Sequence, residues 1–448
     1  MKKFFTTLSN IWKIEDLRVR IINTFFFLLI YRIGSFVALA GVNTSTLDSQ
    51  KTKEGLMGLL NMFAGGSFGR ESIFALGVMP YISASIVVQL LGIAVPYFQK
   101  LQKEGESGRN KLNQWTRYLT IAITALQAIG YIKSQIQPDA HPGIPETMFY
   151  IVSVLELTAG TLFVMWLGEK ITDKGIGNGI SLIIMVGIIA QLPGALANEF
   201  LARVNGTGGL FIFIVEIVAL IAVVMFTILI VQGTRKIAVQ YAKRIVGNKQ
   251  YGGVRQYIPL KVNAAGVMPI IFAQALMFIP ATISQFFPSI ASSGVLIALS
   301  DYTSWAHNLL FAVLIIIFTY FYTAITVNPN QMADDMKKNG GFIPGVKPGK
   351  ATADFIDDVI SKITLPGSIF LAIIAIVPAL AALFGVNAPF ARFFGGTSLI
   401  ILVGVVLDTL QQIESHLLMR HYDGLMKTGR IKGRTAIPSA AGTTTSPI

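Results

Sequence analysis

The stretch GLMGLLNMFAGGSFGRESIFALGVMPYISASIVVQLL, residues 55–91, decides the fold. It opens with an apolar piece, residues 56–64, of roughly three helical turns, less than half of the ~20 residues that a bilayer-crossing helix needs. Gly65 and Gly66 interrupt this piece, and an uncharged run follows over residues 72–99. A short helix that feeds a full-length one leaves backbone ends at membrane depth, where protein or a water-filled cavity must surround them. The stretch therefore predicts an enclosed space near the middle of a membrane protein.

The composition indicates a protein that crosses the membrane many times. Of 448 residues, 53% are hydrophobic and only 13% are charged, whereas a soluble domain has about 25% charged residues. The chain has no cysteine, which excludes thiolate metal sites, thiol nucleophiles and disulfides. Residues 1–20 are basic and amphipathic, and the apolar run after them continues as a spanning segment, so no removable signal peptide is predicted.

Hydropathy predicts ten membrane-spanning segments. They lie at about residues 21–40, 72–94, 117–134, 150–169, 180–199, 210–231, 264–284, 308–328, 363–384 and 393–416. With the N-terminus in the cytosol, 29 of the 36 Lys and Arg residues lie in or beside cytosolic segments, against six in or beside outer ones. Because Lys and Arg are enriched on the cytosolic side, both termini are predicted to be cytosolic.

The ten spans divide into two sets of five, residues 21–199 and 210–416. Since five is odd, the second half would insert with the opposite orientation, as in membrane proteins built from inverted repeats around a central site. No clear sequence repeat accompanies this division, so the prediction rests on geometry. The expected fold is an all-α polytopic membrane protein with two pseudo-symmetric inverted halves.

Two cytosolic connections are long, residues 232–261 and 328–362. Basic cytosolic loops are an ordinary result of topology, but connections above roughly 12–15 residues are often functional. Side by side, the two loops would form a cationic face suited to rRNA phosphates or an acidic protein surface. The tail, residues 417–448, is predicted to be cytosolic, with a disordered end.

Groups that could do chemistry at span depth are few. The charged residues there, Arg32, Glu156, Glu216 and Asp408, do not share one face or one helix pair, so structural pairing is expected for each. The four histidines fall in loops or at span ends, and the sequence holds no HExxH, Walker A or GxSxG motif. The glycine-rich residues 175–179 predict a tight turn between helices. No metal and no cofactor are expected.

The residues alone leave several functions open. A broken helix among apolar spans favours a channel and a secondary transporter for a small solute about equally. A transporter would need carboxylates or cation-coordinating groups that converge at the midplane. An intramembrane enzyme ranks behind both, because it requires a paired acid–base or metal constellation that the sequence does not offer.

Five motifs resemble those of one family. They are FALGVMPYISASIVVQLL at residues 74–91, KEGESGR at 103–109, WLGEKITDKGIGNGISLII at 166–184, PLKVNAAGVMP at 259–269 and NPNQMADDMKKNGGFIPGVKPG at 328–349. Through these motifs, the chain resembles the SecY/Sec61α protein-conducting channels, in their bacterial form, over about residues 23–419.

This resemblance implies an hourglass pore between the two halves, whose waist is an apolar ring. The positions that match the ring are Val78, Ile82, Ile180, Ile184, Ile271 and Ile401. A short plug helix at about residues 56–67 would block the outer side, through Leu56, Leu59, Leu60, Met62 and Phe63 with the hinge glycines Gly65 and Gly66. Position 78 is valine where family members often have isoleucine, a loss that the ring should tolerate.

The resemblance also implies a lateral gate, a seam between the second and third spans and the seventh and eighth. Polar residues of this gate would be Ser83, Gln89, Gln127 and Asn263. Polar side chains there should ease opening toward lipid, because a wholly apolar seam would offer water no hydrogen-bond partners.

The two long loops would dock the SecA motor or the ribosome, and SecE and SecG would be partner subunits. Residues expected at the docking surface are Arg235, Lys236, Lys243, Arg244, Lys337, Lys338 and Lys347. Lys347 stands where bacterial relatives commonly have arginine, which keeps the charge but not the planar fork. Other implied partners are preproteins, nascent chains and signal sequences, SecDF, a YidC-type insertase and membrane lipids. The expected location is the bacterial plasma membrane, and no enzyme activity is expected.

Overall fold

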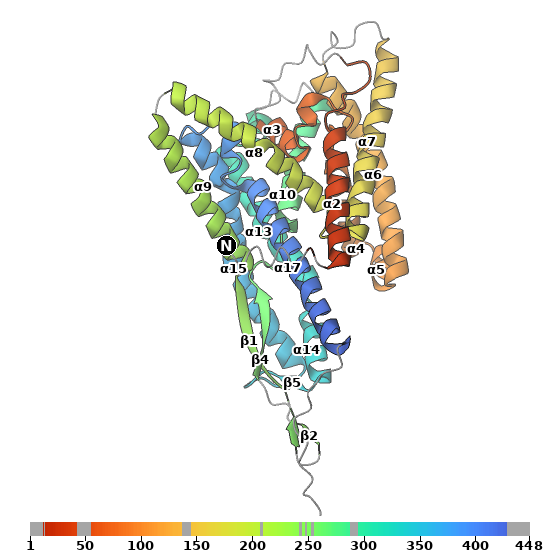
Figure 1. The fold of residues 1–448 in the computed structure, drawn as a ribbon, viewed down its shortest axis with the longest axis vertical. Coiled ribbons are helices and arrows are strands. Elements are labelled where there is room, and N and C mark those ends of the chain that lie inside the picture. The colour runs from red at the N-terminus through yellow and green to blue at the C-terminus, as the bar shows by residue number, and fades with distance from the viewer. Residues whose placement is uncertain are drawn as a thin grey trace, which may run out of the picture.

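The computed structural model shows a bundle of helices with a smaller extension at one end (Figure 1). The extension carries β1 (Thr234–Tyr241), β4 (Arg255–Lys261) and α14 (Pro329–Lys338). The structure describes residues 12, 14–42, 55–136, 145–206, 209–241, 244–246, 249–251, 255–286 and 294–427, although not every side chain within them.

Ten helices within this description correspond to the ten predicted spans. They are α2 (Glu15–Gly34), α4 (Met79–Ala94), α6 (Glu106–Gln135), α7 (Glu146–Lys174), α8 (Gly179–Asn205), α9 (Gly209–Gln232), α10 (Met268–Phe286), α13 (Trp305–Thr326), α15 (Lys350–Leu383) and α17 (Gly396–Lys427). Six of them are long and apolar enough on their own to cross a membrane, or seven if α4 and the helix after it count as one bent span. Helix α17 continues to Lys427, beyond residue 417 where the tail was predicted to begin.

The helices pack as two sets. In the first set α4 contacts α6, α6 contacts α7, and α7 contacts both α8 and α2. In the second set α10 packs on α13, α13 on α15, and α15 on α9 and α17. The sets meet along two lines, where α8 contacts α9 and α17, and where α10 contacts α4 and α6.

The second predicted span is helical only in part. Helix α3 (Gly55–Phe63) is followed by turns and a short 3₁₀ helix, η2 (Phe68–Arg70), and α4 begins only at Met79. Gly65 and Gly66 have positive φ angles, +66° and +87°, a conformation that glycine adopts without a Cβ penalty. The break therefore lies at the glycines, as the sequence predicts.

Helix α4 ends in a sharp corner. The chain bends by 103° between α4 and α5 (Pro96–Lys103). Val95, at the corner, is extended because the ring of the following Pro96 disfavours helical backbone in the residue before it.

The two long loops contain strands and a helix, for which the sequence analysis made no prediction. Strand β1 pairs antiparallel with β4, from Thr234 opposite Lys261 to Gln240 opposite Arg255. The other edge of β1 pairs with β5 (Gly341–Phe342) from the second loop, so the two loops lie side by side. Alternating residues of β1 face an apolar core shared with α14 and α15; it includes Ile237, Val239, Met336, Ile343 and Ile356. Smaller elements are β2 (Arg244–Val246), β3 (Lys249–Tyr251), α12 (Gly294–Ser300) and α16 (Ala388–Ala391).

A tight turn joins α7 to α8, as residues 175–179 predict. The Asn178 side-chain oxygen caps α8 by accepting from the Ser181 backbone N–H at 3.3 Å. Gly179 lies so close to α7 that a methyl group on it would overlap the Gly168 carbonyl oxygen and lie 2.7 Å from the Ile171 Cβ. Only glycine fits this approach.

We expect Gly179→Ala to lower the free energy of unfolding by about 1–3 kcal/mol, the usual cost of forced overpacking. The thermal midpoint of the purified complex measures it. Gly194→Ala, also in α8, is the matched control: no atom lies within 4 Å of its added methyl group, and alanine favours helix by about 1 kcal/mol over glycine. Equal midpoints for the two variants would contradict the close approach of α7 and α8.

Candidate functional site

The main candidate site is a cavity of about 500 Å³ between the two helix sets. Its walls come from α4, the start of α8, residues 265–272, Tyr322 of α13, and α17. Polar side chains of α17 line one part, among them Asp408, Gln411, Gln412 and Ser415. These positions lie in the middle of α17, whose C-terminal end reaches the loop extension (Figure 1).

Apolar side chains also line the cavity, and five of the six predicted ring residues are among them. They are Ile82, Ile180, Ile184, Ile271 and Ile401. The sixth, Val78, is 2% exposed and does not line the cavity, but it belongs to the same contiguous apolar cluster as the other five. The structure therefore gathers all six positions, from four separate segments, in one apolar cluster that borders the cavity.

Helix α3 supplies further members of this cluster. Met62 and Phe63 are buried in it, and Leu60 packs against a second cluster that contains Ala128 and Leu157. The predicted plug segment thus packs in the same apolar cluster as the ring residues. The side chains of Leu56 and Leu59 lie outside the described residues.

The C-terminal end of α3 is held by four side chains, which we call the plug clasp: Tyr31, Arg32, Arg70 and Gln191. Arg32 Nη1 donates to the Gly65 carbonyl at 2.8 Å, and Arg70 Nη2 donates to the same oxygen at 3.3 Å. Tyr31 donates to the Ala64 carbonyl at 3.4 Å, and Gln191 donates to the Asn61 carbonyl at 2.7 Å.

The clasp matches the chemistry of a helix end. The last carbonyls of a helix have no partner within it and carry partial negative charge, so cationic donors there are stabilising. Both guanidinium groups also lie over the Phe36 ring, at 5.0 Å for Arg32 and 4.3 Å for Arg70, which favours their position further. All four clasp residues belong to α2, η2 or α8, and so to the N-terminal part of the chain.

The other side of α3 faces the second helix set. A methyl group on Gly58 would overlap the guanidinium of Arg392, which is only 5% exposed and lies over the Tyr302 ring. The plug helix is therefore enclosed between the clasp and a buried arginine of the C-terminal part of the chain.

The predicted lateral-gate residues lie on α4, on α6 and in the turn before α10. Gln89 lines the cavity and donates to the Ser85 hydroxyl at 3.2 Å on its own helix. Asn263 is 5% exposed and donates to the Gly266 carbonyl at 2.9 Å, which holds the turn before α10. Ser83 on α4 and Gln127 on α6 are half-buried. Helices α4 and α6 do meet α10.

The predicted docking residues lie on the loop extension. Arg235 and Lys236 of β1 are exposed, as are Lys337 and Lys338 at the end of α14 and Lys347 after β5. Because β1 pairs with β5, these groups share one end of the molecule. Lys243 lies outside the described residues, and so does the side chain of Arg244.

The charged residues predicted at span depth have separate environments. Glu156 accepts from the Ala40 backbone N–H at 3.0 Å, Glu216 forms an ion pair with Arg203 at 2.6 Å, and Asp408 lines the cavity. Arg32 belongs to the plug clasp, which sequence reasoning missed because its acceptors are backbone oxygens. Among the described side chains, no three His, Asp or Glu residues are grouped as metal ligands.

Comparisons with known proteins agree on one family. A family model named SecY matches residues 72–410. The protein translocase subunit SecY of Halalkalibacterium halodurans is 47% identical over 433 residues, which cover 94% of this chain and 100% of that protein. The Streptomyces scabiei subunit of the same name is 43% identical over 438 residues, with the same coverage.

Solved structures show the same fold. A protein-conducting channel has a TM-score of 0.64 at 18% identity, over 93% of this chain and 95% of that one. Sec61 in the canine ribosome-channel complex from the endoplasmic reticulum has a TM-score of 0.59 at 17% identity, with the same coverage. These channels have ten helices in two halves, so the predicted fold class is confirmed.

Proposed function

The chain belongs to the SecY family, and from that premise we propose that it is the central channel subunit of a Sec translocon. It passes unfolded polypeptides across the bacterial plasma membrane and releases apolar segments sideways into lipid. We take residues 21–199 and 210–416 as the two halves of the channel, with the N- and C-termini in the cytosol.

The observation that carries this proposal is the apolar cluster that borders the cavity. Ile82, Ile180, Ile184, Ile271 and Ile401 meet there, with Met62 and Phe63 packed in the same cluster. An ion in such a constriction loses its hydration shell and finds no replacement ligands, so the waist excludes ions by dewetting. The same side chains offer a threaded polypeptide no specific hydrogen bonds, and this suits a cargo of every sequence.

Sideways release follows from the contact of α10 with α4 and α6. If this contact opens, a segment in the cavity can partition between water and lipid. A central Leu, Ile, Phe or Val gains about 0.3–0.6 kcal/mol by entering the bilayer. Gln89, which lines the cavity beside this line of contact, can form hydrogen bonds with water there.

The loop extension supports the proposed cytosolic partners. Exposed Arg235, Lys236, Lys337, Lys338 and Lys347 form a cationic end suited to rRNA phosphates of a ribosome or to acidic groups of a SecA motor. The similarity to Sec61 from a ribosome-channel complex is consistent with a ribosome as the partner. Partner subunits SecE and SecG, with SecDF and a YidC-type insertase, follow from family membership.

A crosslinking experiment tests the conduit. The chain has no cysteine, so single cysteines at Ile82 or Ile184 can be crosslinked to a stalled nascent chain without background. We expect strong crosslinks at both positions because both line the cavity. Ile189→Cys is the control and should give little product, because Ile189 of α8 is 43% exposed on the outer surface of the chain. Equal yields at all three positions would reject a central conduit.

A further inference from the structure

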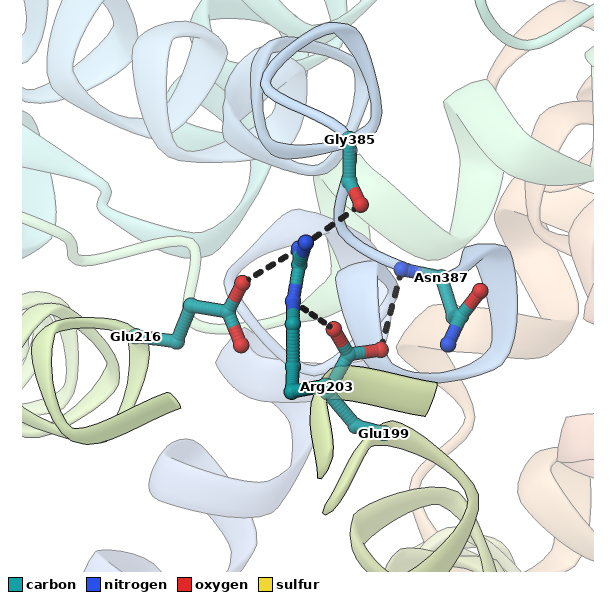
Figure 2. Close-up of polar contacts among 5 residues, drawn as sticks. All are labelled: Glu199, Arg203, Glu216, Gly385 and Asn387. Atoms are coloured by element: carbon teal, nitrogen blue, oxygen red, sulfur yellow. Dashed lines mark hydrogen bonds and ion pairs between the residues drawn. The ribbon is translucent and has the colours of Figure 1, made fainter. Parts of the chain in front are cut away.

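A buried ion cluster lies where the chain passes from the first helix set to the second (Figure 2). It consists of Glu199 and Arg203 from the last turns of α8, Glu216 from α9, and the backbone of Gly385 and Asn387 between α15 and α16. We call this group the hinge clamp.

Every bond of the hinge clamp converges on Arg203 or Glu199. Arg203 Nε donates to Glu199 Oε1 at 2.9 Å, and its Nη2 donates to Glu216 Oε1 at 2.6 Å and to the Gly385 carbonyl at 2.7 Å. Glu199 Oε2 accepts from the Asn387 backbone N–H at 3.0 Å. One arginine thus joins three separate segments, as Figure 2 shows.

The clamp is shielded from solvent, and its geometry is specific. The side chain of Glu199 is 0% exposed, that of Glu216 7% and that of Arg203 13%. A planar guanidinium directs its donors in fixed directions, which a lysine cannot reproduce. Charge-assisted bonds in such a setting are strong, and removal of one partner leaves a buried charge without compensation.

The clamp joins the two helix sets rather than strengthening one of them. Helix α8 packs on α7 and α2 of the first set, whereas α9 packs on α15 and α17 of the second. Among the ion pairs of the described residues, Arg203–Glu216 alone joins helices of different sets. None of the ion pairs of the described residues joins α10 to α4 or α6.

We propose that Arg203 is a positioning residue that locks the two helix sets together at the α8–α9 side, so that cargo opens the channel only along the contact of α10 with α4 and α6. This inference rests on the proposed channel function. The closed side acts as a hinge because the clamp resists separation there, while the opposite contact has no comparable bond in the described part of the chain.

Distances between paired spin labels in the complete translocon test the proposal, since the chain has no cysteine of its own. One pair, Leu201 with Leu380, spans the clamp side; the other, Leu126 with Leu276, spans the opposite contact. All four positions are exposed. In the wild type, a stalled signal-sequence substrate should lengthen only the second distance. In Arg203→Ala the first distance should also lengthen, by several ångströms.

Three further variants make the result specific. Glu216→Ala keeps the neutral Arg203–Glu199 pair and should give a smaller shift of the first distance, even if Arg203→Ala fails to fold. Glu216→Gln retains an acceptor for Arg203 and should behave as wild type. Arg117→Ala removes a different ion pair, to Glu169 at 2.7 Å within the first set, and should leave the first distance unchanged.

An unchanged first distance in both Arg203→Ala and Glu216→Ala would overturn the proposal, as would an equal shift in Arg117→Ala. Crosslinking of the nascent chain at Ile82 in the same preparations separates this outcome from failure of the channel function. If the nascent chain still crosslinks at Ile82 while the first distance stays unchanged in the variants, only the proposed role of the hinge clamp is rejected. Loss of crosslinks in the wild type would reject the channel itself.

Discussion

Replacement of Ile184 and Ile401 with serine is expected to make the resting channel conduct ions. Both residues are 2% exposed and belong to the apolar cluster that borders the cavity. Two hydroxyl groups would hold water at the proposed waist, which lowers the cost of bringing an ion through it. Each 1.4 kcal/mol removed from that barrier raises the ion flux about tenfold, so an increase of at least that order is expected. Ion flux across bilayers that contain the purified complex measures it.

Two controls separate dewetting from a general loosening of the helices. The double change to valine keeps the waist apolar and slightly enlarges it, so it should conduct far less than the serine variant. Ile189→Ser places the same hydroxyl on the exposed face of α8 and should not change the flux. Equal conductance of the serine and valine variants would show that the apolar character of the side chains is not what excludes ions at the waist.

Loss of the strongest clasp bond should release the plug. In Arg32→Ala the Gly65 carbonyl loses its 2.8 Å charge-assisted donor and keeps only the 3.3 Å contact to Arg70. Such bonds contribute about 1.5–3 kcal/mol, which corresponds to a rise of about 10- to 100-fold in the population of displaced plug. A cysteine at Met62, buried in the closed state, should then react correspondingly faster with a membrane-impermeant thiol reagent.

The clasp also predicts an order among variants. Arg70→Ala removes the longer bond and should raise the labelling rate less than Arg32→Ala does. Arg32→Lys keeps the cation but not the planar donor set, so its rate should fall between wild type and alanine. Labelling of Arg32→Ala at the wild-type rate would mean that the apolar contacts of Met62 and Phe63 hold the plug without the clasp.

The membrane-embedded architecture could be predicted from the sequence because its main signals are local. Runs of apolar residues mark the spans, and Gly65–Gly66 marks the break after α3 with the positive φ angles that only glycine adopts freely. The ring positions could be placed only through motif resemblance. An isoleucine at a pore waist and one that faces lipid have the same side chain, and periodicity does not distinguish them.

Interactions over long sequence separations were not predictable. The bond from Arg32 to Gly65 and the bond from Arg203 to Gly385 involve backbone acceptors, which leave no trace in residue type. Pairing was expected for Glu216, but its partner was counted among loop charges because Arg203 follows the predicted end of its span. The β1–β4 pairing was hidden for a similar reason, since its alternating apolar residues are few and lie among basic ones.

The cavity between the helix sets has an electrical consequence. In the proposed channel, water that fills the cavity from the cytosolic side would carry the potential of that compartment to the apolar cluster, so the membrane voltage would fall across much less than the bilayer thickness. Moving one elementary charge through 100 mV corresponds to about 2.3 kcal/mol. Each lysine or aspartate of a threaded chain therefore experiences most of that energy within the short passage beside Ile184 and Ile401, where the local field is strongest.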